Sequence, residues 1–491
     1  MGPNRQIGRA VSRRKFLAVL GAGGAFVTLG ATGCSSQQPA AQPTQAPKPA
    51  ATQAPKPAAT QAPKPAATQA PASAAGASLK LWILKTYVEP TNKAIEESAQ
   101  AWAKANKASV SVEYFTFEDM QTRFVASIET KSTPDVAQLE TGAPIRFHAM
   151  GQLHDLTALM KDMEGTVGQI PDNFKSVVTT GGKVVAIPWY TMHAFWYIWR
   201  DVFDKAKIPY PKTFQEAKEA GAKLTKESEN FYGIGQSWNR TSDGYGVMQS
   251  LMYSYGASWA DENGKWKSLK TPEMMAALKW ATDIYTEKIV PPDCLSWTGS
   301  QNNEAFIAKK IASTSNGPSI TFALENAVAN AKDAADKKAK EEALANSLAL
   351  PHPGGPAGQR SWAIASSLGM FKSTKNPDAA MSLIKHLSSP EEMNKIMQQS
   401  YGQFAPVLTK VREATKDYFN KNENYRTFGE AAKYFAGTGW PGPTTAAAAE
   451  VQASNVLTDM PAKVIVDKWS LEQALDWADK KIKEIYDTIP S

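Results

Sequence analysis

The first 78 residues contain a repeat that prevents regular structure, and this leaves the whole fold to the rest of the chain. The octad TQAPKPAA occurs three times from Thr44 to Ala67 and degenerates to TQAPASAA from Thr68. Its prolines prevent helix formation and remove sheet donors, so residues 35–78 are predicted to form a solvated tether that leans toward polyproline II. The octad has no apolar face with which to stack as a solenoid. Residues 79–491 remain, and this length predicts two lobes.

A predicted export leader precedes the tether. Ser12–Leu17 reads SRRKFL, and the apolar run Leu17–Leu29 that follows is too short and too glycine-rich for a comfortable membrane span. The run ends at Ala31-Thr32-Gly33-Cys34, which resembles a bacterial lipobox. We therefore expect residues 1–34 to be a twin-arginine lipoprotein signal, with Cys34 lipidated at the outer face of the bacterial cytoplasmic membrane. Ordinary cleavage nearby is the alternative.

The positive charge belongs to the leader and tether. The chain is formally +7, but the first 78 residues hold eight Lys and Arg and no acid, which leaves 46 basic against 47 acidic residues in the remainder. No basic face for a nucleic acid is implied. With Cys34 assigned to lipid, Cys294 stands alone, so no disulfide framework is expected.

Apolar spacing in the domain alternates between strand and helix. The predicted elements are strand 78–84, helix 90–106, strand 109–117, a helix through Met120–Ile128, strand 134–139, a hairpin at 181–188 that runs into a strand, helices from Thr213 and Thr271, helix 332–345 and strand 347–350, before a mostly helical end. This order favours an α/β doubly wound first lobe. Ligands in such sheets bind at the carboxyl ends of the strands, here the loops Lys85–Tyr87 and Glu140–Gly142.

Six segments across nearly all of the globular part form a recognisable series. They are TPDVAQLETGAPIRFHAMGQLHDLT from Thr133, GGKVVAIPWYTMHAFWYIWRDVFDKAKI from Gly181, PYPKTFQEAKEAGAKL from Pro209, EAFIAKKIASTSNGPSI from Glu304, SLALPHPGGP from Ser347, and SLGMFKSTKNPDAAMSLIKHLSSPEEMNKIMQQSYGQFAPV from Ser367. In this order, behind a lipoprotein leader, they resemble the family 1 extracellular solute-binding proteins of ABC importers, the relatives of maltose-binding protein.

The resemblance implies a two-lobed α/β fold of the periplasmic-binding-protein type, with the ligand in the cleft between the lobes. The expected first lobe is 79–188 with 349–366, and the expected second lobe is 189–348 with 367–491. Crossings are expected near Pro188–Tyr190, Leu348–Pro351 and Gly369–Lys372. It further implies a monomer that closes around its ligand by hinge motion and is then read by a membrane permease.

Sugar sites combine flat aromatic faces with planar polar groups, and the domain supplies 14 Trp. Matching positions to the family's motifs gives the predicted ligand-binding residues Lys85, Glu140, Thr141, Gly142, Trp189, Tyr190, Met192, Trp238, Trp297, Asn316, Trp362, Ser366, Ser367 and Trp440. The chain departs from the family at two of its positions. Met192 stands where sugar binders often place a polar contact, and Ser319 replaces the tryptophan of the NGPW turn, which weakens the case for maltodextrin.

Other chemistry is poorly supported by the sequence. The five histidines are scattered, and no cofactor or metal is expected. A secreted glycoside hydrolase would need two carboxylates opposed across a cleft, and only Glu140 has a positional claim. We therefore predict a non-enzymatic protein that delivers a neutral carbohydrate to an ABC importer. The first alternative is a surface sensor or lectin that works without a transporter. A hydrolase is the weakest alternative.

Overall fold

The computed structural model describes residues 74–489, which belong to one compact unit, Gln69–Ser491. The predicted signal, Cys34 and nearly all of the tether lie outside the described residues. Gly76 and Ala77, which precede the expected domain start at Leu79, contact the domain, because Gly76 N donates to Lys107 O at 2.9 Å and Ala77 is buried.

A six-stranded mixed sheet forms the first lobe, in the order β11-β6-β10-β3-β1-β2. The outer strands β1, β2 and β3 run parallel, whereas β10 lies antiparallel between β3 and β6, and β11 is antiparallel to β6. The bounds are β1 Ser78–Leu84, β2 Ser109–Phe115, β3 Val136–Glu140, β6 Ile187–His193, β10 Ala363–Met370 and β11 Ala405–Pro406. The predicted alternation of parallel strands with helices at the start of the domain is confirmed.

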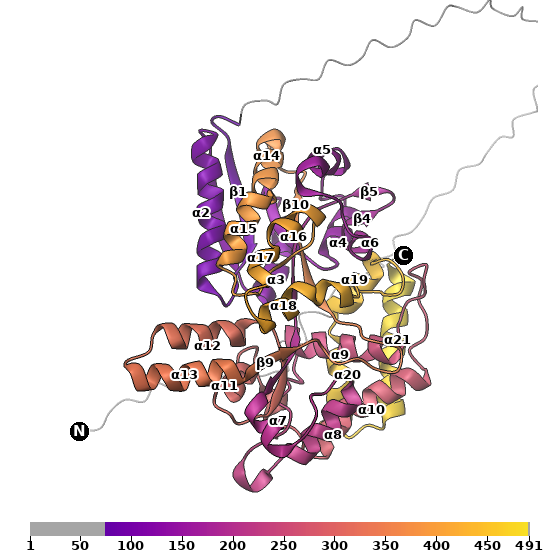
Figure 1. Ribbon diagram of the computed structural model, residues 1–491. Helices are drawn as coiled ribbons and strands as arrows, with labels where there is room; N and C mark the ends of the chain where they lie inside the picture. Colours follow the sequence, from indigo (N-terminus) through magenta and orange to yellow (C-terminus); the bar gives the residue numbers. More distant parts are fainter. Residues whose placement is uncertain (1–73, 490–491) are drawn as a thin grey trace, which may run out of the picture. The chain divides into compact units, whose positions relative to one another are not determined.

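Helices pack around this sheet, and α2 contacts β2, α14 and α15 (Figure 1). Ile95, Ala99 and Trp102 of α2 recur at helical spacing and are buried, which is why this segment forms an amphipathic helix. The helices are α2 Glu89–Ala105, α3 Phe117–Glu129, α4 Ala143–Ala149, α5 Thr157–Val167, α6 Asp172–Val178, α14 Pro377–Leu387, α15 Pro390–Gln398, α16 Thr409–Ala414 and α17 Lys416–Phe419. The hairpin β4 Thr179–Thr180 with β5 Lys183–Val184 lies before β6.

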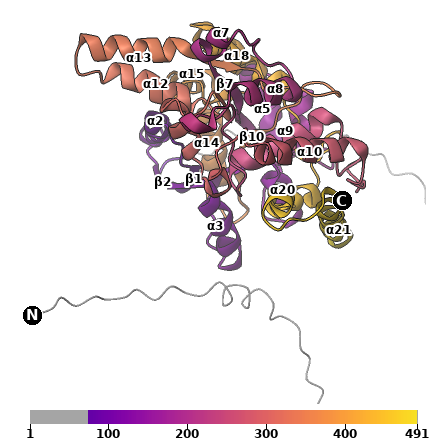
Figure 2. The same cartoon turned by 90° about the horizontal axis from the view of Figure 1, so that it is seen from below.

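A three-stranded antiparallel sheet, in the order β8-β7-β9, forms the centre of the second lobe. Its strands are β7 Phe195–Trp199, β8 Ser313–Asn316 and β9 Ser347–Leu350. The helices are α7 Arg200–Ala206, α8 Phe214–Leu224, α9 Ser242–Tyr255, α10 Pro272–Thr286, α11 Gln301–Ile307, α12 Ser319–Ala329, α13 Ala334–Asn346, α18 Glu423–Glu430, α19 Ala446–Ala453, α20 Val456–Ile465 and α21 Leu471–Thr488, with 3₁₀ turns Glu227–Glu229, Cys294–Ser296 and Ala431–Tyr434. The C-terminal α20 and α21 lie side by side (Figure 2).

The first two connections between the sheets differ from the expected crossings. Strand β6 remains in the first sheet as far as His193, so the chain crosses at Ala194 rather than at Pro188–Tyr190. Strand β9 pairs with β7 along its whole length, so the return crossing begins after Leu350 and ends at β10. The hydrogen-bonded register, which sequence motifs do not reveal, sets both positions.

The expected third crossing at Gly369–Lys372 is wrong. Gly369 pairs with Ala137 of β3, and Lys372 N donates to Gln152 O, so both residues belong to the first lobe. Helices α14 and α15 also pack on α2, which assigns residues 367–398 to the first lobe rather than the second. The last connection between the lobes is made by α18 and the segment that leads to α19. Helix α18 contacts both α17 of the first lobe and β9 of the second, and Ser361 N donates to Tyr434 O at 2.8 Å.

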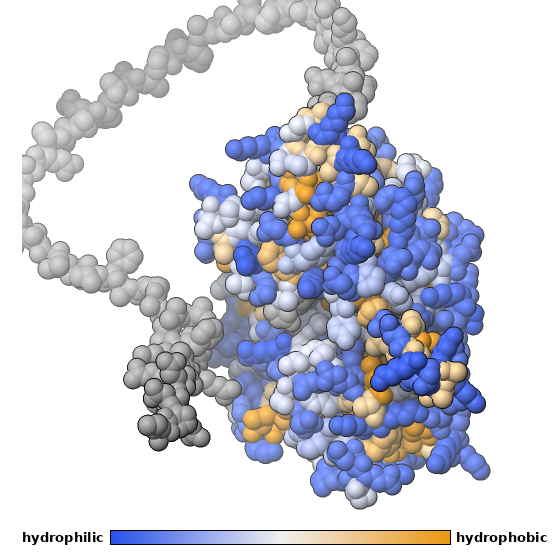
Figure 3. Space-filling view, turned by 90° about the vertical axis from the view of Figure 1, so that its left-hand side faces the viewer, coloured by the Kyte–Doolittle hydropathy of each residue, from blue (hydrophilic) through white to orange (hydrophobic). Residues whose placement is uncertain are grey.

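Polar side chains cover most of the face shown in Figure 3, and the hydrophobic areas on it are small and separate. Within residues 74–489 no helix combines the length and apolarity that crossing a bilayer requires.

We predict that Thr213→Ala destabilises the second lobe by about 1 kcal/mol. Thr213 Oγ1 accepts from Glu216 N at 3.1 Å and the Glu216 carboxylate accepts from Thr213 N, a reciprocal pair that begins α8. Urea unfolding measures the change. Gln215→Ala, at an exposed position two residues further along the same turn, is the matched control and should cost less than about 0.5 kcal/mol. Equal losses for the two variants would contradict the cap.

Candidate ligand cleft

A cavity of about 420 Å³ lies where the carboxyl end of β3 meets the start of α9, and this volume is in the range of small-molecule sites. The first lobe contributes residues from α3 and from the β3–α4 turn. The second contributes the start of α9, the end of the crossing at Trp362, and the region of α19. The lining residues are Thr122, Val125, Glu140, Gly142, Ala143, Arg146, Arg240, Thr241, Ser242, Tyr245, Trp362, Ala449, Gln452, Ala453 and Asn455.

Strand register places a row of polar side chains beneath the cavity. Ser366 of β10 pairs with Glu140 of β3 on one side and with Tyr190 of β6 on the other. Ser366 Oγ lies 2.9 and 3.1 Å from the two oxygens of the Glu140 carboxyl group. Gln138, two residues earlier on the same face of β3, donates from Nε2 to Glu140 Oε1 at 2.5 Å. Neutral donors on two neighbouring strands, β3 and β10, therefore hold the carboxyl group in place.

The electrostatics of Glu140 are unusual because its neighbours carry no compensating charge. Burial raises its pKa from the ordinary 4.5 to about 7, and the hydrogen bonds from Ser366 and Gln138 oppose that shift only in part. Tyr190 is fully buried next to it, and burial together with the Glu140 charge raises the Tyr190 pKa well above 10. Near pH 7 the Glu140 carboxyl group is therefore present in both its protonated and its ionised form.

The turn after β3 brings the backbone very close to α19. Thr141 takes a positive φ of 43°, and its N donates to Ala365 O at 2.7 Å. A Cβ on Gly142 would lie 2.4 Å from the Cβ of Ala449, so only glycine allows this approach. The two sides of the cleft meet here at one edge of the cavity.

Aromatic side chains form the opposite wall. The ring of Trp362 lies against α9, where a Cβ on Gly246 would lie 2.6 Å from its Cε3, and Tyr245 meets it edge-on at 5.6 Å. Trp362 N donates to Ser250 Oγ at 2.9 Å. The buried Trp362 Nε1 has no hydrogen-bond partner among the described residues. The wall thus offers an apolar surface and one donor for a ligand.

Further buried polar atoms near the start of α9 also lack partners within residues 74–489. Both amide atoms of Gln249 are in this state, and Gln249 lies one turn after Tyr245 on the same helical face. In the loop before the helix, Trp238 Nε1 and Gln236 Oε1 are also buried without a hydrogen-bond partner. Buried polar groups normally find partners, so their concentration here favours a polar-ligand site.

The two arginines that line the cavity are each engaged by an acid. Arg240 donates from Nε and Nη2 to the two carboxylate oxygens of Asp459, both at 2.7 Å. Arg146 Nε lies 3.6 Å from Glu450 Oε2. Neither arginine forms an ion pair with Glu140.

Three of the predicted ligand-binding residues line this cavity: Glu140, Gly142 and Trp362. Thr141 and Ser366 contact the same group of residues from beneath. Trp189 is instead a core residue, since its Nε1 donates to Leu387 O at 2.9 Å and the side chain is buried against the first sheet. Whether any of them contacts a ligand stays a prediction.

The other predicted residues do not line the cavity. Lys85 is exposed after β1, Tyr190 packs on Phe404, and Met192 packs between clusters of the first lobe. Trp238 and Trp297 are buried in the second lobe, and Trp297 O accepts from Ser237 Oγ. Asn316 ends β8 and accepts from Ser319, Ser367 donates to Leu139 O, and Trp440 is half-buried beneath Arg360.

Sequence reasoning did not select much of the second-lobe wall. Arg240 ends the polar, aromatic loop 236–240, which was a usable signal. Gln452 and Asn455 follow the alanine run of α19, which resembles an ordinary buried helix and gives no signal of a site. Only the tertiary contact of α19 with α4 brings these residues to the cavity.

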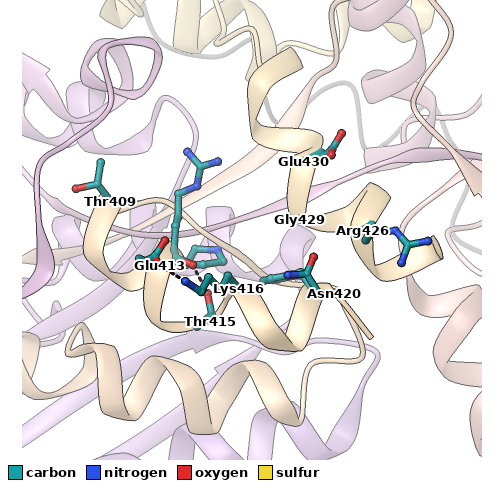
Figure 4. A pocket seen from close by; sticks show the side chains of 11 residues that line it. Thr409, Glu413, Thr415, Lys416, Asn420, Arg426, Gly429 and Glu430 are labelled. Carbon is teal, nitrogen blue, oxygen red and sulfur yellow. Dashed lines mark hydrogen bonds and ion pairs between the residues drawn. The ribbon is translucent and has the colours of Figure 1, made fainter. Parts of the chain in front are cut away.

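A second cavity, of about 410 Å³, lies on α16–α18 and is shown in Figure 4. Its charged side chains belong to Arg412, Glu413, Lys416, Arg426 and Glu430, and Lys416 pairs with Glu413. None of its lining residues carries a buried polar side-chain atom that lacks a partner. This second cavity therefore lacks the buried polar groups without hydrogen-bond partners that line the cleft.

Residues 86–394 match the bacterial extracellular solute-binding protein family, and the chain belongs to that family. A binding protein of Brucella abortus is 23% identical over 346 residues, which cover 70% of this chain and 79% of the relative. The fold is confirmed by solved structures. A Thermotoga lettingae ABC transporter solute-binding protein bound with α-D-tagatose has a TM-score of 0.71 at 20% identity and covers 84% of this chain and 100% of its own.

Two further structures share the fold. An Arthrobacter chlorophenolicus sugar transporter with bound laminaribiose gives a TM-score of 0.70 at 17% identity, with 83% and 99% of the two chains covered. Maltose-bound MalE3 of T. maritima gives 0.68 at 21% identity, with 83% and 100% covered. The predicted two-lobed fold is therefore confirmed.

We predict that Glu140→Gln raises the free energy of unfolding at pH 8 but not at pH 4.5. The folded state holds a proton on Glu140 up to about pH 7, while the unfolded chain releases it near 4.5. Wild-type stability therefore falls as pH rises through this window, by up to about 3 kcal/mol. Urea unfolding at pH 4.5, 6 and 8 measures the difference. Glu413→Gln, on the surface cavity, is the control, and a pH-independent gap would contradict the prediction.

Proposed function

We propose that the chain captures a carbohydrate in the cleft between its lobes and presents it to an ABC permease. The observation that carries the proposal is the combination of the Trp362 and Tyr245 rings with the buried carboxyl group of Glu140 around one cavity. Aromatic faces suit the apolar side of a sugar ring, and fixed polar groups suit its hydroxyls. The bound tagatose, maltose and laminaribiose of the structural neighbours support the same ligand class.

Binding without turnover is part of this proposal. Hydrolysis of a glycosidic bond needs two carboxyl groups facing the substrate, and Glu140 is the single acid among the lining residues described above. Glu450 and Asp459 are paired with the cavity arginines, and the buried Asp243 of α9 accepts from Asn302 Nδ2 at 2.9 Å. Release of a reducing end from any bound oligosaccharide, abolished in Glu140→Gln, would overturn this part of the proposal.

We also propose that the lobes move about the crossings at Ala194 and 351–362. Aromatic contacts outside the cavity join the lobes, because Phe322 of α12 meets Tyr87 at 6.4 Å and Tyr401 at 4.8 Å. Tyr87 follows β1 in the first lobe and is 60% exposed. Such a partly exposed contact can separate and reform at low cost when a hinge opens.

Replacing Trp362 by Phe should weaken carbohydrate binding about tenfold, because the variant keeps a ring against Gly246 but loses the unpartnered Nε1 donor. A thermal-shift screen of tagatose, maltose and laminaribiose identifies a probe, and calorimetry gives the two dissociation constants. Trp469→Phe, at a half-buried tryptophan beside Lys463, is the control. If only amino acids, polyamines or metals shift the melting point of the wild type, the carbohydrate proposal is wrong.

The proposed anchor and tether should serve location and not affinity. Cys34→Ala should release the protein from the membrane fraction, whereas a chain that starts at Ser78 should bind the same probe equally well. The physical reason is that the octads carry no apolar face with which to contact the domain. Cell fractionation and calorimetry are the measurements. Loss of affinity in the truncated chain, or membrane retention of Cys34→Ala, would contradict this division of roles.

A further inference from the structure

The charges around the cleft are arranged so that one negative charge is left without a partner. Of the charged residues that line the cavity, Glu140 is acidic and Arg146 and Arg240 are basic. Each arginine pairs with an acid from the α19–α20 region, whereas Glu140 forms no ion pair with any residue in the described range. The paired arginines largely cancel, and the uncompensated charge on the cavity wall is that of the Glu140 carboxylate.

Arg240, which lines the cavity, is already engaged by a carboxylate of the protein. Arg240 uses Nε and one terminal nitrogen in a two-bond fork to Asp459, with both distances 2.7 Å. An acidic ligand would have to compete with that carboxylate for the same donors, and the fork geometry is the one that recognises carboxylates and phosphates best. Both arginines that line the cavity are therefore already paired with protein carboxylates, and an acidic ligand would have to share or displace these pairs.

The groups that face Glu140 from each neighbouring element are neutral or paired. Gln138 from β3 and Ser366 from β10 donate to its oxygens, and Tyr190 from β6 is neutral at physiological pH because its pKa is raised. Arg146 on α4 is held by Glu450 of α19, and Arg240 before α9 is held by Asp459 of α20. Ser366 Oγ approaches both oxygens, but Oε2 receives no other hydrogen bond from the described residues and can accept from a ligand.

We propose that Glu140 selects ligands by charge, so that the cleft accepts carbohydrates that supply hydroxyl donors and rejects uronic acids and sugar phosphates. This inference rests on the proposed carbohydrate function. A hydroxyl that donates to a carboxylate makes a charge-assisted hydrogen bond, which is about twice as strong as a neutral one. A ligand anion at the same place meets like-charge repulsion in a buried, poorly screened site.

The selection should depend on pH in a defined direction. Because burial holds the pKa of Glu140 near 7, the carboxylate predominates at pH 8 and the neutral acid at pH 5.5. Lowering the pH through 7 protonates Glu140. This removes its repulsion of an anionic ligand and also makes it a weaker hydrogen-bond acceptor for ligand hydroxyls. Neutral carbohydrates should therefore lose affinity in acid while their acidic counterparts gain it.

The test compares matched ligand pairs by calorimetry with the full chain at pH 8 and 5.5. Galactose is paired with galacturonate, glucose with glucuronate, and glucose with glucose 6-phosphate, so that each pair keeps the pyranose ring and differs in charge. For any pair in which a member binds, we expect the neutral member to bind at least about tenfold tighter at pH 8 and the gap to narrow at pH 5.5. Glu140→Gln should remove most of the gap and most of its change with pH. Asp243 of α9, which follows the lining residue Ser242, is a second buried carboxyl group whose pKa burial raises to about 6, so its own titration can leave a remainder.

A second variant and a control keep the result interpretable. Glu450→Gln frees Arg146 without touching Glu140 and should improve binding of the acidic member, while Glu413→Gln on the surface cavity should change neither. Equal affinity for both members of a binding pair at pH 8, or discrimination that survives Glu140→Gln, overturns the charge selection and leaves the proposed function standing. Absence of binding to every carbohydrate overturns both.

Discussion

The hydrogen-bonded insertion of β10 between β3 and β6 is the constraint on which the cleft depends. This strand reaches the first sheet only after the chain has built most of the second lobe, and it runs antiparallel to both neighbours. Its register aligns Ser366 with Glu140 and Tyr190. A slip of one residue would turn Ser366 to the other face of the sheet and leave the carboxyl group of Glu140 without its hydroxyl donor.

The same strand connects the site to the hinge. Trp362 immediately precedes β10, and Ser361 exchanges backbone hydrogen bonds with the segment that leads to α19. The aromatic wall of the cavity therefore belongs to the crossing itself, whereas Glu140 belongs to the sheet. The proposed movement of the lobes would change the separation of these two walls. A partner that contacts only the outer surface of the molecule could then respond to ligand binding.

Much of the fold could be predicted from the sequence because local patterns carry it. The alternation of β1, α2 and β2, and the caps Thr213 and Thr271, follow from apolar spacing and capping chemistry. The lobe boundaries could not be predicted in this way, since the positions of Gly369 and His193 depend on pairing with strands far away in sequence. Within the site, Glu140 followed from its place after a buried strand. Gln452 and Asn455 could not, because their helix is only an alanine-rich apolar segment until α4 packs on it.

The close approach of Gly142 to Ala449 has a consequence for how ligand preference can change. At that edge of the cavity the opposing surfaces are a bare backbone and a single methyl group, so no side chain remains to be trimmed. Substitutions at these two residues therefore cannot enlarge the cavity much at this edge. Room for a longer or bulkier ligand would have to come from lining residues that do carry side chains, such as Thr122 and Val125 of α3.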